Sequence, residues 1–258
     1  MKPQPDRDWD VDILGVRVSA VTMEMALNRL ERLVTTPSSS YVCVRDAHGI
    51  IQSQGNEALR LIHNNAAMVT PDGMPIVWSG KWAGAHWMRR VYGPDLLLAA
   101  CEYGLPRGWR HFLYGGGPGV AERLTASLRK RFPGIDIIGN RTPPFRQFDE
   151  GFVLEEVSNL KQMLPDIVWI GLSTPKQEKL ASMLAALWHG PVFIGVGAAF
   201  DFHAGTKKQA PKLLQRSGLE WLFRLMQEPR RLGPRYASVI PRFFLQTARN
   251  KPRIVSRE

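Results

Sequence analysis

The stretch HFLYGGGPGVAERLTASLRKRF, residues 111–132, contains the pattern that decides the fold. Its first four residues are aromatic or mostly apolar, as in a strand that is covered on both faces of a sheet. Four glycines and a proline follow, and Val120, Leu124 and Leu128 then recur at a spacing of four, which predicts a helix over 119–132. A strand, a tight turn and a helix in this order are typical of an α/β domain.

The same unit recurs along the chain. Short apolar or β-branched runs predict further strands at 41–44, 135–138, 167–171 and 192–196. A second amphipathic pattern predicts a helix over 175–188. The sequence therefore predicts a Rossmann-like α/β fold, with a mostly parallel sheet and flanking helices.

Composition indicates one main globular domain. The chain has 258 residues, 44% of them hydrophobic, which is enough to bury one sizeable core. Its two cysteines, Cys43 and Cys101, stand far apart and predict a reducing compartment without a disulfide framework. No signal-peptide pattern and no apolar run of membrane-spanning length is present, so we expect a cytoplasmic protein.

Positive charge is concentrated at the C-terminal end. Between residues 224 and 257 there are eight Arg and one Lys against one Glu, so this segment supplies about +8 of the formal net charge of +11. We therefore divide the chain into an α/β domain over 1–217 and a basic helical appendage over 218–258.

Ligands of such folds bind beyond the carboxyl ends of the strands, so the turns that follow the strands are the candidate sites. The turn formed by Gly115, Gly116 and Gly117 precedes a helix and could cradle a phosphate. A tight turn that needs positive φ explains it equally well. An NAD site would also require an acid at the end of the next strand, whereas Asp136 is predicted to lie inside that strand.

Two further turns carry polar side chains. In GLSTPKQE, residues 171–178, Lys176 and Gln177 could face a substrate, although Thr174, Pro175 and Gln177 also fit a helix cap. In GVGAAFDFHAGTKKQAP, residues 195–211, small side chains leave room around Asp201. No His, Cys or acidic spacing indicates a metal, so we predict no metal site.

Asp72 lies between a proline and a glycine in VTPDGMPIVW, residues 69–78. A partly desolvated carboxylate there would be a good base near neutral pH. Aspartate is also a good N-cap for a helix that begins near Met74. From the residues alone, the cap is the preferred explanation.

Six motifs in a fixed order resemble the WecG/TagA/CpsF family of glycosyltransferases over about residues 12–240. They are PDG at 71–73, RVYGPDL at 90–96, FLYGGGPGVAE at 112–122, GLSTPKQE at 171–178, GVGAAFDFHAG at 195–205 and GLEWLFRLMQEPRRLGPRY at 218–236. The resemblance implies inverting, metal-independent transfer of a hexose-type sugar from a UDP-sugar to a polyprenyl-diphosphate-linked sugar, without a cofactor. Such enzymes build cell-envelope polymers and exopolysaccharides at the inner face of the membrane.

The resemblance also implies roles for residues. Asp72 matches the proposed catalytic base, which takes the acceptor hydroxyl's proton, and Gly73 leaves room for substrate. Arginines of the appendage would hold the departing diphosphate in place of a metal. The predicted substrate-binding residues are Asp46, Gly73, Asp95, Gly115, Gly116, Gly117, Lys176, Gln177, Glu178, Asp201, Arg224, Arg231 and Arg235.

The chain departs from the family after its first predicted strand. Val44 and Asp46 stand where relatives typically have Thr and Asn. A methyl group thus replaces a hydroxyl, and a carboxylate replaces an amide, so the sugar could differ from N-acetylmannosamine. Pro234 also replaces an Arg found in many members.

The appendage has an apolar stripe of Tyr236, Val239, Ile240, Phe243 and Phe244 at helical spacing, with Arg242 beside it. This pattern is typical of a helix that lies on an anionic membrane, and we expect peripheral membrane association. Packing against the protein's own core is the alternative. Because of Pro241, the helix is predicted to begin near Ser238.

Two other classes of function account for part of the sequence. A pI near 10 and the Arg-rich tail would suit a nucleic-acid-binding protein, but no motif of that class is present, so we expect no nucleic-acid partner. An NAD-dependent oxidoreductase lacks its ribose-binding acid. The periodicity leaves open whether the chain forms a homo-oligomer.

Overall fold

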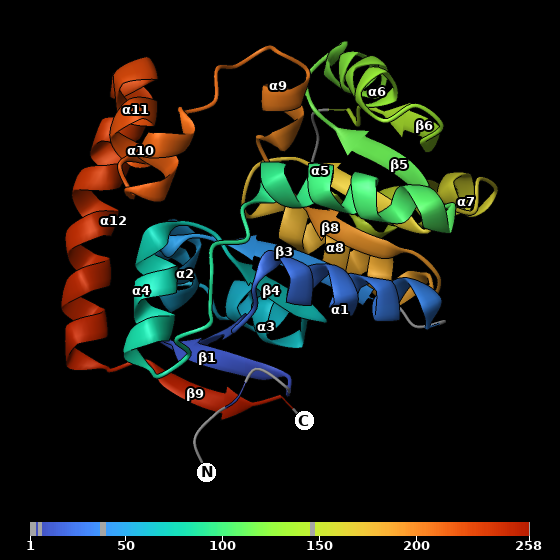
Figure 1. Ribbon diagram of the computed structural model, residues 1–258. Coiled ribbons are helices and arrows are strands. Elements are labelled where there is room, and N and C mark those ends of the chain that lie inside the picture. Colours follow the sequence, from blue (N-terminus) through green and yellow to red (C-terminus); the bar gives the residue numbers. More distant parts are fainter. Residues whose placement is uncertain (1–3, 5–6, 37–39, 145–147, 258) are drawn as a thin grey trace.

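The computed structural model describes residues 4, 7–36, 40–144 and 148–257. A six-stranded parallel sheet forms its centre, in the order β4-β3-β8-β7-β5-β6 (Figure 1). The strands are β3 (Ser40–Arg45), β4 (Met68–Pro71), β5 (Arg110–Gly115), β6 (Asp136–Arg141), β7 (Ile167–Gly171) and β8 (Val192–Gly195). The predicted fold class and all five predicted strands of this sheet are confirmed, whereas the four-residue β4 was missed.

Helices cover both faces of the sheet, as its apolar strands require. One face carries α1 (Met23–Thr35), α5 (Gly93–Gly104) and α6 (Val120–Arg131). The other carries α2 (Ala47–Gln54), α3 (Glu57–Asn65), α4 (Met74–Trp82), α7 (Glu150–Lys161) and α8 (Lys176–Leu187). Successive side chains of β5 alternate between the two cores, with Phe112 and Tyr114 in one and Leu113 in the other. A single 3-10 turn, η1 (Leu105–Arg107), joins α5 to β5.

A second sheet brings the two ends of the chain together. It is antiparallel, in the order β2-β1-β9, and consists of β1 (Trp9–Ile13), β2 (Val16–Ser19) and β9 (Arg253–Ser256). Val11, Ile13, Val16 and Val18 are fully buried and anchor this sheet in the main core. The segment after the last helix is therefore tied to the N-terminal strands (Figure 1).

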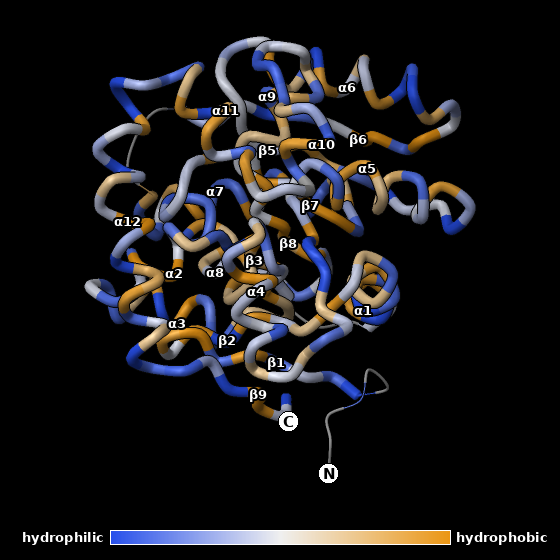
Figure 2. The backbone as a smooth tube through the Cα atoms, turned by 60° about the vertical axis from the view of Figure 1, so that its left-hand side comes forward, coloured by the Kyte–Doolittle hydropathy of each residue, from blue (hydrophilic) through white to orange (hydrophobic). Residues whose placement is uncertain are grey.

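Four helices complete the chain: α9 (Ala199–His203), α10 (Lys212–Arg216), α11 (Glu220–Gln227) and α12 (Pro229–Arg249). The predicted helix start near Ser238 is wrong, because α12 continues through both Pro234 and Pro241. Each interior proline removes a helical hydrogen bond, which costs about 3 kcal/mol or more in an isolated helix. Burial of Leu232, Val239 and Phe243 against the protein offsets this cost. Figure 2 shows hydrophobic and hydrophilic residues interspersed along α12.

Candidate active site

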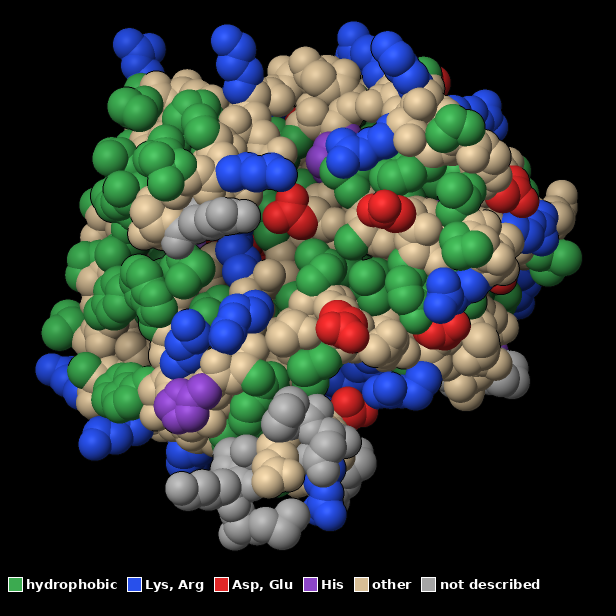
Figure 3. Space-filling model, viewed as in Figure 1, with side chains coloured by type: hydrophobic (Ala, Val, Ile, Leu, Met, Phe, Trp, Pro, Cys, Tyr) green, Lys and Arg blue, Asp and Glu red, His purple; other side chains and the backbone are tan. Residues whose placement is uncertain are grey.

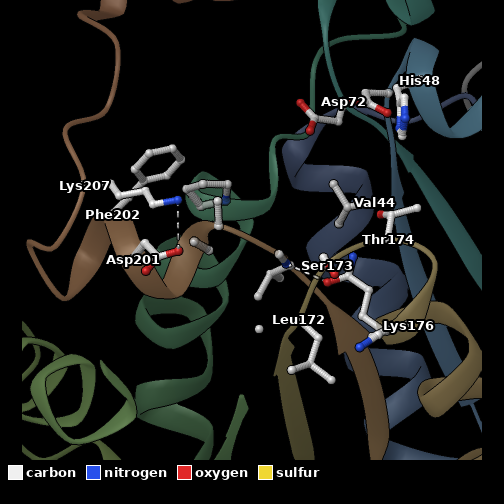
Figure 4. Close-up of a pocket in the computed structure, with 18 of the residues that line it drawn as sticks. Val44, His48, Asp72, Leu172, Ser173, Thr174, Lys176, Asp201, Phe202 and Lys207 are labelled. Atoms are coloured by element: carbon white, nitrogen blue, oxygen red, sulfur yellow. Dashed lines mark hydrogen bonds and ion pairs between the residues drawn. The ribbon is translucent and has the colours of Figure 1, made fainter. Parts of the chain in front are cut away.

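The carboxyl ends of the parallel strands face α11 and α12 across a cavity of about 470 Å³. We call it the polar cavity. In Figure 4, Asp72 and His48 lie at one end of it, and Asp201 and Lys207 lie across from them. The predicted catalytic and substrate-binding residues that line it are Asp46, Asp72, Gly116, Gly117, Lys176, Gln177, Asp201, Arg224, Arg231 and Arg235. Tyr236, which was predicted to contact lipid, lines it as well. The turns after the strands thus form the cavity, as the fold class predicts.

Asp72 immediately follows β4. Its backbone N–H donates to the carbonyl of Arg45 at 2.7 Å, which continues the pairing of β3 with β4 by one residue. The next residue, Gly73, adopts φ of 82°, where a Cβ would be strained, and α4 begins after it without a side-chain cap. The explanation of Asp72 as an N-cap is therefore wrong. Its side chain, 21% exposed, lines the polar cavity instead.

Charged groups surround the Asp72 carboxylate. The pKa of this carboxyl is raised to about 7, and burial is the main cause. Arg90 and Arg224 act to lower the pKa, whereas the negative charges of Glu220 and Asp46 add to the increase. The nearest cation is Arg90, whose Nη2 lies 3.5 Å from Oδ1 of Asp72. A carboxylate with such a pKa can accept a proton near neutral pH and release it again.

The glycine turn after β5 contributes two of its three predicted residues. Gly116 and Gly117 line the polar cavity, but Gly115 does not. A Cβ on Gly115 would lie 2.6 Å from the carbonyl oxygen of Gly171, so this position requires glycine to let β5 and β7 end side by side. Gly115 therefore has a structural position behind the cavity.

The turn after β7 places Lys176 at the cavity, whereas the side chains of the next two residues, Gln177 and Glu178, bind other parts of the protein. The amide of Gln177 accepts from the N–H of Gly197 at 2.9 Å and donates to Glu178 at 2.9 Å, so it does not cap α8. Glu178 does not line the polar cavity and forms a buried ion pair with Arg45. Glu178 thus has no access to substrate in this arrangement.

The three remaining acids differ in position. Asp46 caps α2 by accepting from the N–H of Gly49 at 2.9 Å, and it also lies 3.5 Å from Arg235. Asp201, on α9, accepts from Thr206 at 3.1 Å and lies 4.0 Å from Lys207. Asp95 is exposed in the first turn of α5 and does not line the polar cavity. The structure therefore brings Asp46 and Asp201 to the site and leaves Asp95 outside it.

Three arginines of the appendage project over the polar cavity. Arg224 comes from α11, and Arg231 and Arg235 come from α12. Arg231 pairs with Glu228, and Glu228 has Lys207 as a second cationic neighbour. Within the described part of the chain, no group of three His, Cys, Asp or Glu side chains is arranged to hold a metal ion.

A second, smaller cavity of about 170 Å³ lies on the other side of Asp72, between α4, α11 and α12. We call it the apolar cavity. Trp78, Trp221 and Phe244 contribute aromatic walls, and Gly73 and Asp72 form its polar end. Its lining also includes Met74, Pro75, Val239, Ile240 and Phe243. Asp72, Asp46, His48, Arg224 and Tyr236 border both cavities.

This arrangement corrects the predicted lipid-contacting stripe. Val239 and Phe243 are buried at 8% and 1% exposure, and Phe243 belongs to the main core, so neither lies on the outer surface that a membrane would contact. Tyr236 and Ile240 are half-buried, whereas Phe244 and Arg242 are exposed. Packing against the protein, the alternative explanation, thus holds for the inner side of α12. No helix among the described residues is long and apolar enough to cross a membrane.

Several residues of the site were not predicted. Arg90 and Tyr92 lie within the quoted RVYGPDL motif, and Arg90 stacks on the Tyr92 ring with 4.0 Å between its guanidinium carbon and the centroid. Glu220 and Trp221 lie within the quoted appendage motif. The two motifs were the sequence signal that could have pointed to these four residues. Only the three-dimensional contacts distinguish them from the other residues of the same motifs.

Comparison with known proteins assigns the chain to a family. The pattern of the glycosyl transferase WecG/TagA/CpsF family matches residues 11–256. The chain belongs to this family. An N-acetylglucosaminyldiphosphoundecaprenol N-acetyl-beta-D-mannosaminyltransferase of Staphylococcus aureus strain MW2 is 26% identical over 250 residues, which cover 95% of this chain and 94% of the relative. A protein of the same name from Bacillus spizizenii is 27% identical over 183 residues, or 70% of this chain and 68% of the relative.

Membership favours a glycosyl transferase over the nucleic-acid-binding protein and the NAD-dependent oxidoreductase. The position of Asp136 agrees with this choice. It is the first residue of β6, 3.9 Å from Arg110 at the amino end of β5, and therefore at the opposite edge of the sheet from the cavities.

Proposed function

We propose that this protein transfers a sugar from a UDP-sugar to a polyprenyl-diphosphate-linked sugar, with inversion and without a metal ion. One observation carries the proposal. A carboxylate with a pKa raised to about 7 lies where a polar cavity roofed by arginines meets an apolar cavity. The two substrates of such a transfer differ in the same way, since one is a nucleotide diphosphate and the other carries a lipid.

In the proposed reaction, Asp72 acts as the general base. The acceptor hydroxyl attacks the anomeric carbon of the donor, and a new carbon–oxygen bond forms as the bond to the diphosphate breaks. Asp72 takes the hydroxyl proton, and the bond electrons leave with UDP. The product glycoside is inverted because attack comes from the side opposite the leaving group.

Arg224, Arg231 and Arg235 would stabilise the departing UDP. A guanidinium stays charged and matches diphosphate oxygens with paired hydrogen bonds. Gly116 and Gly117, at the turn before α6, let the backbone approach the same end of the donor. In this proposal, the positive charge of the appendage supplies what a divalent cation supplies in other sugar transferases.

Val44 and Asp46, at one wall of the polar cavity, bear on which sugar is transferred. The relatives transfer N-acetylmannosamine, as their names state. Here, Asp46 offers a carboxylate that already binds the N–H of Gly49 and lies 3.5 Å from Arg235, and Val44 offers no hydroxyl at the cavity wall. We infer that the sugar contacts at this wall differ from those of a Thr and Asn pair.

We further propose peripheral attachment to an anionic membrane through the outer surface of α4 and α12 rather than through the buried stripe. Trp82, Phe244 and Leu245 are 53%, 46% and 59% exposed. Figure 3 shows hydrophobic side chains gathered on the side of the molecule where α4, α11 and α12 lie, with basic side chains among them. An apolar surface next to basic groups favours the interface of an anionic bilayer.

A donor screen tests the reaction. Purified protein is given a polyprenyl-diphosphate-linked N-acetylglucosamine with UDP-glucose, UDP-N-acetylmannosamine or the corresponding uronic acid, and released UDP is measured with and without chelator. We expect acceptor-dependent UDP release from at least one donor, unchanged by the chelator. Release that requires added magnesium or manganese, or none with any donor, would overturn the proposal.

Sedimentation with phosphatidylglycerol vesicles tests the attachment. We expect the Trp82→Ser, Leu245→Ser double variant to stay in the supernatant at a vesicle concentration that sediments the wild type. The matched control is Leu61→Ser, since Leu61 is 52% exposed on α3. Equal sedimentation of all three proteins would contradict attachment through this surface.

A further inference from the structure

Arg90 joins the candidate base to the appendage. Its Nη2 lies 3.5 Å from Oδ1 of Asp72 and 2.5 Å from Oε2 of Glu220, the first residue of α11. Its Nη1 lies 3.5 Å from the side-chain oxygen of Gln215, and its guanidinium stacks on the ring of Tyr92. The guanidinium is therefore held on several sides, with its closest contact to the appendage.

All three charged groups are largely shielded from water. The side chains of Arg90, Glu220 and Asp72 are 14%, 12% and 21% exposed. Charges in such surroundings interact more strongly than on an open surface. One arginine between two carboxylates cannot compensate both fully, so the position of Glu220 affects how strongly Arg90 binds Asp72.

We propose that Glu220 is a positioning residue that, when α11 lies over the site, engages Arg90 and so frees Asp72 to act as the base. This inference rests on the proposed function and deepens it. Without Glu220, the guanidinium would pair with Asp72 alone and compete with the acceptor hydroxyl for its oxygens. The base would then be engaged by the protein when the substrate arrives.

The location of Glu220 links this effect to nucleotide binding. Arg224 lies one helical turn further along α11 and borders both cavities. A ligand that draws Arg224 onto a diphosphate thus also holds Glu220 against Arg90. A second ion pair of opposite polarity, Asp46 with Arg235 at 3.5 Å, ties α12 to the N-cap of α2. Nucleotide binding at Arg224 would therefore stabilise the leaving-group site and the contact that frees the base together.

The effects of the neighbouring charges on the pKa of Asp72 agree with this role. The charged groups that interact with Asp72 are Arg90, Arg45 and Asp46 of the α/β domain and Glu220 and Arg224 of α11. His48, Tyr92 and Tyr236 are the other titratable side chains that line the cavities beside it. Glu220 raises the pKa of Asp72, whereas Arg90 lowers it. Removing the charge of Glu220 should therefore lower the pKa of Asp72, and the acid limb of activity should move to lower pH.

Carbon NMR of protein labelled at the aspartate carboxyl carbons tests this without any substrate, and Asp72→Asn assigns the signal. In Glu220→Gln, we expect the Asp72 titration midpoint roughly one pH unit below that of the wild type. Glu220→Asp, which keeps a carboxylate, should restore most of the difference. Glu31→Gln is the control, because Glu31 pairs with Arg107 at 2.7 Å on α1, away from both cavities.

Turnover measured across pH in the same variants completes the test. Glu220→Gln should lower the turnover plateau about threefold to tenfold and move its acid limb the same way as the NMR midpoint. An unchanged midpoint in Glu220→Gln, or an equal shift in Glu31→Gln, would overturn the inference. Because the midpoint needs no donor, a shifted midpoint in a protein that releases no UDP would support the coupling of Glu220 to Asp72 and reject the proposed reaction.

Discussion

The two cavities that meet at Asp72 differ in nearly every physical property. The polar cavity has about 470 Å³, two glycines of a tight turn and arginines from α11 and α12. The apolar cavity has about 170 Å³ and aromatic walls from Trp78, Trp221 and Phe244. Arginines suit anions, whereas tryptophan and phenylalanine suit a lipid or the apolar face of a sugar. The difference indicates from which side each substrate reaches the shared carboxylate.

The comparison also explains why the appendage is part of the site. The apolar cavity lies between α4 of the main domain and α11 and α12, and the arginines of the polar cavity come from the same two helices. Neither cavity would have its present walls without them. Substitutions that affect one cavity, both or neither should therefore give separable effects on donor, acceptor and turnover.

The largest effect is expected at the junction, where both cavities depend on one group. Asp72→Asn removes the proton acceptor but keeps the size of the side chain, so turnover should fall by about 10²-fold to 10⁴-fold. The dissociation constant of UDP should change by no more than severalfold, measured by calorimetry. Turnover close to that of the wild type would remove Asp72 from the mechanism.

In the wild type, the same carboxyl should impose a pH dependence. A base must be deprotonated to act, and burial raises the pKa of Asp72 to about 7. The turnover rate with donor and acceptor should therefore increase as the pH rises through about 7 and level off above it. A profile already flat at pH 5 would contradict the raised pKa.

A smaller effect is expected from the polar cavity alone. Arg231→Ala should weaken UDP binding about tenfold, because a charge-assisted hydrogen bond to phosphate contributes roughly 1.5 kcal/mol or more. Arg242→Ala is the control on the same helix, exposed and outside both cavities. An equal loss in both variants would indicate a general effect of positive charge rather than contact with the diphosphate.

The sequence predicted the strands, turns and helices of the fold better than the contacts between residues at the site. The burial of β5 on both faces follows directly from its apolar run, so strand, turn and helix could be located from the sequence. The glycine turn predicted a close approach of backbone, but only the packing against Gly171 distinguishes Gly115 from Gly116. Such distinctions depend on residues distant in sequence, which periodicity does not encode.

The C-terminal helix shows the same limit. The spacing of Val239, Ile240 and Phe243 correctly predicts an apolar side, but an apolar side fits lipid and protein equally well. By local rules, the prolines predicted that this helix begins late. Burial of its inner side against the protein outweighs that local preference. Similarly, the carboxylate of Asp46 could be predicted near the site, but its pairing with Arg235 required the fold.

The smallest effect is expected from the apolar cavity. Trp78→Ala should raise the KM for a short-chain polyprenyl-diphosphate acceptor severalfold, through lost apolar contact, while the dissociation constant of UDP stays unchanged. Trp82→Ala, one turn further along α4 and outside both cavities, should leave both constants unchanged in an assay without membranes. If Trp78→Ala instead weakened UDP binding and spared the acceptor, the two cavities would have to exchange their assigned substrates. Because Asp72 borders both, its role as base would survive that exchange, whereas the direction of attack would not.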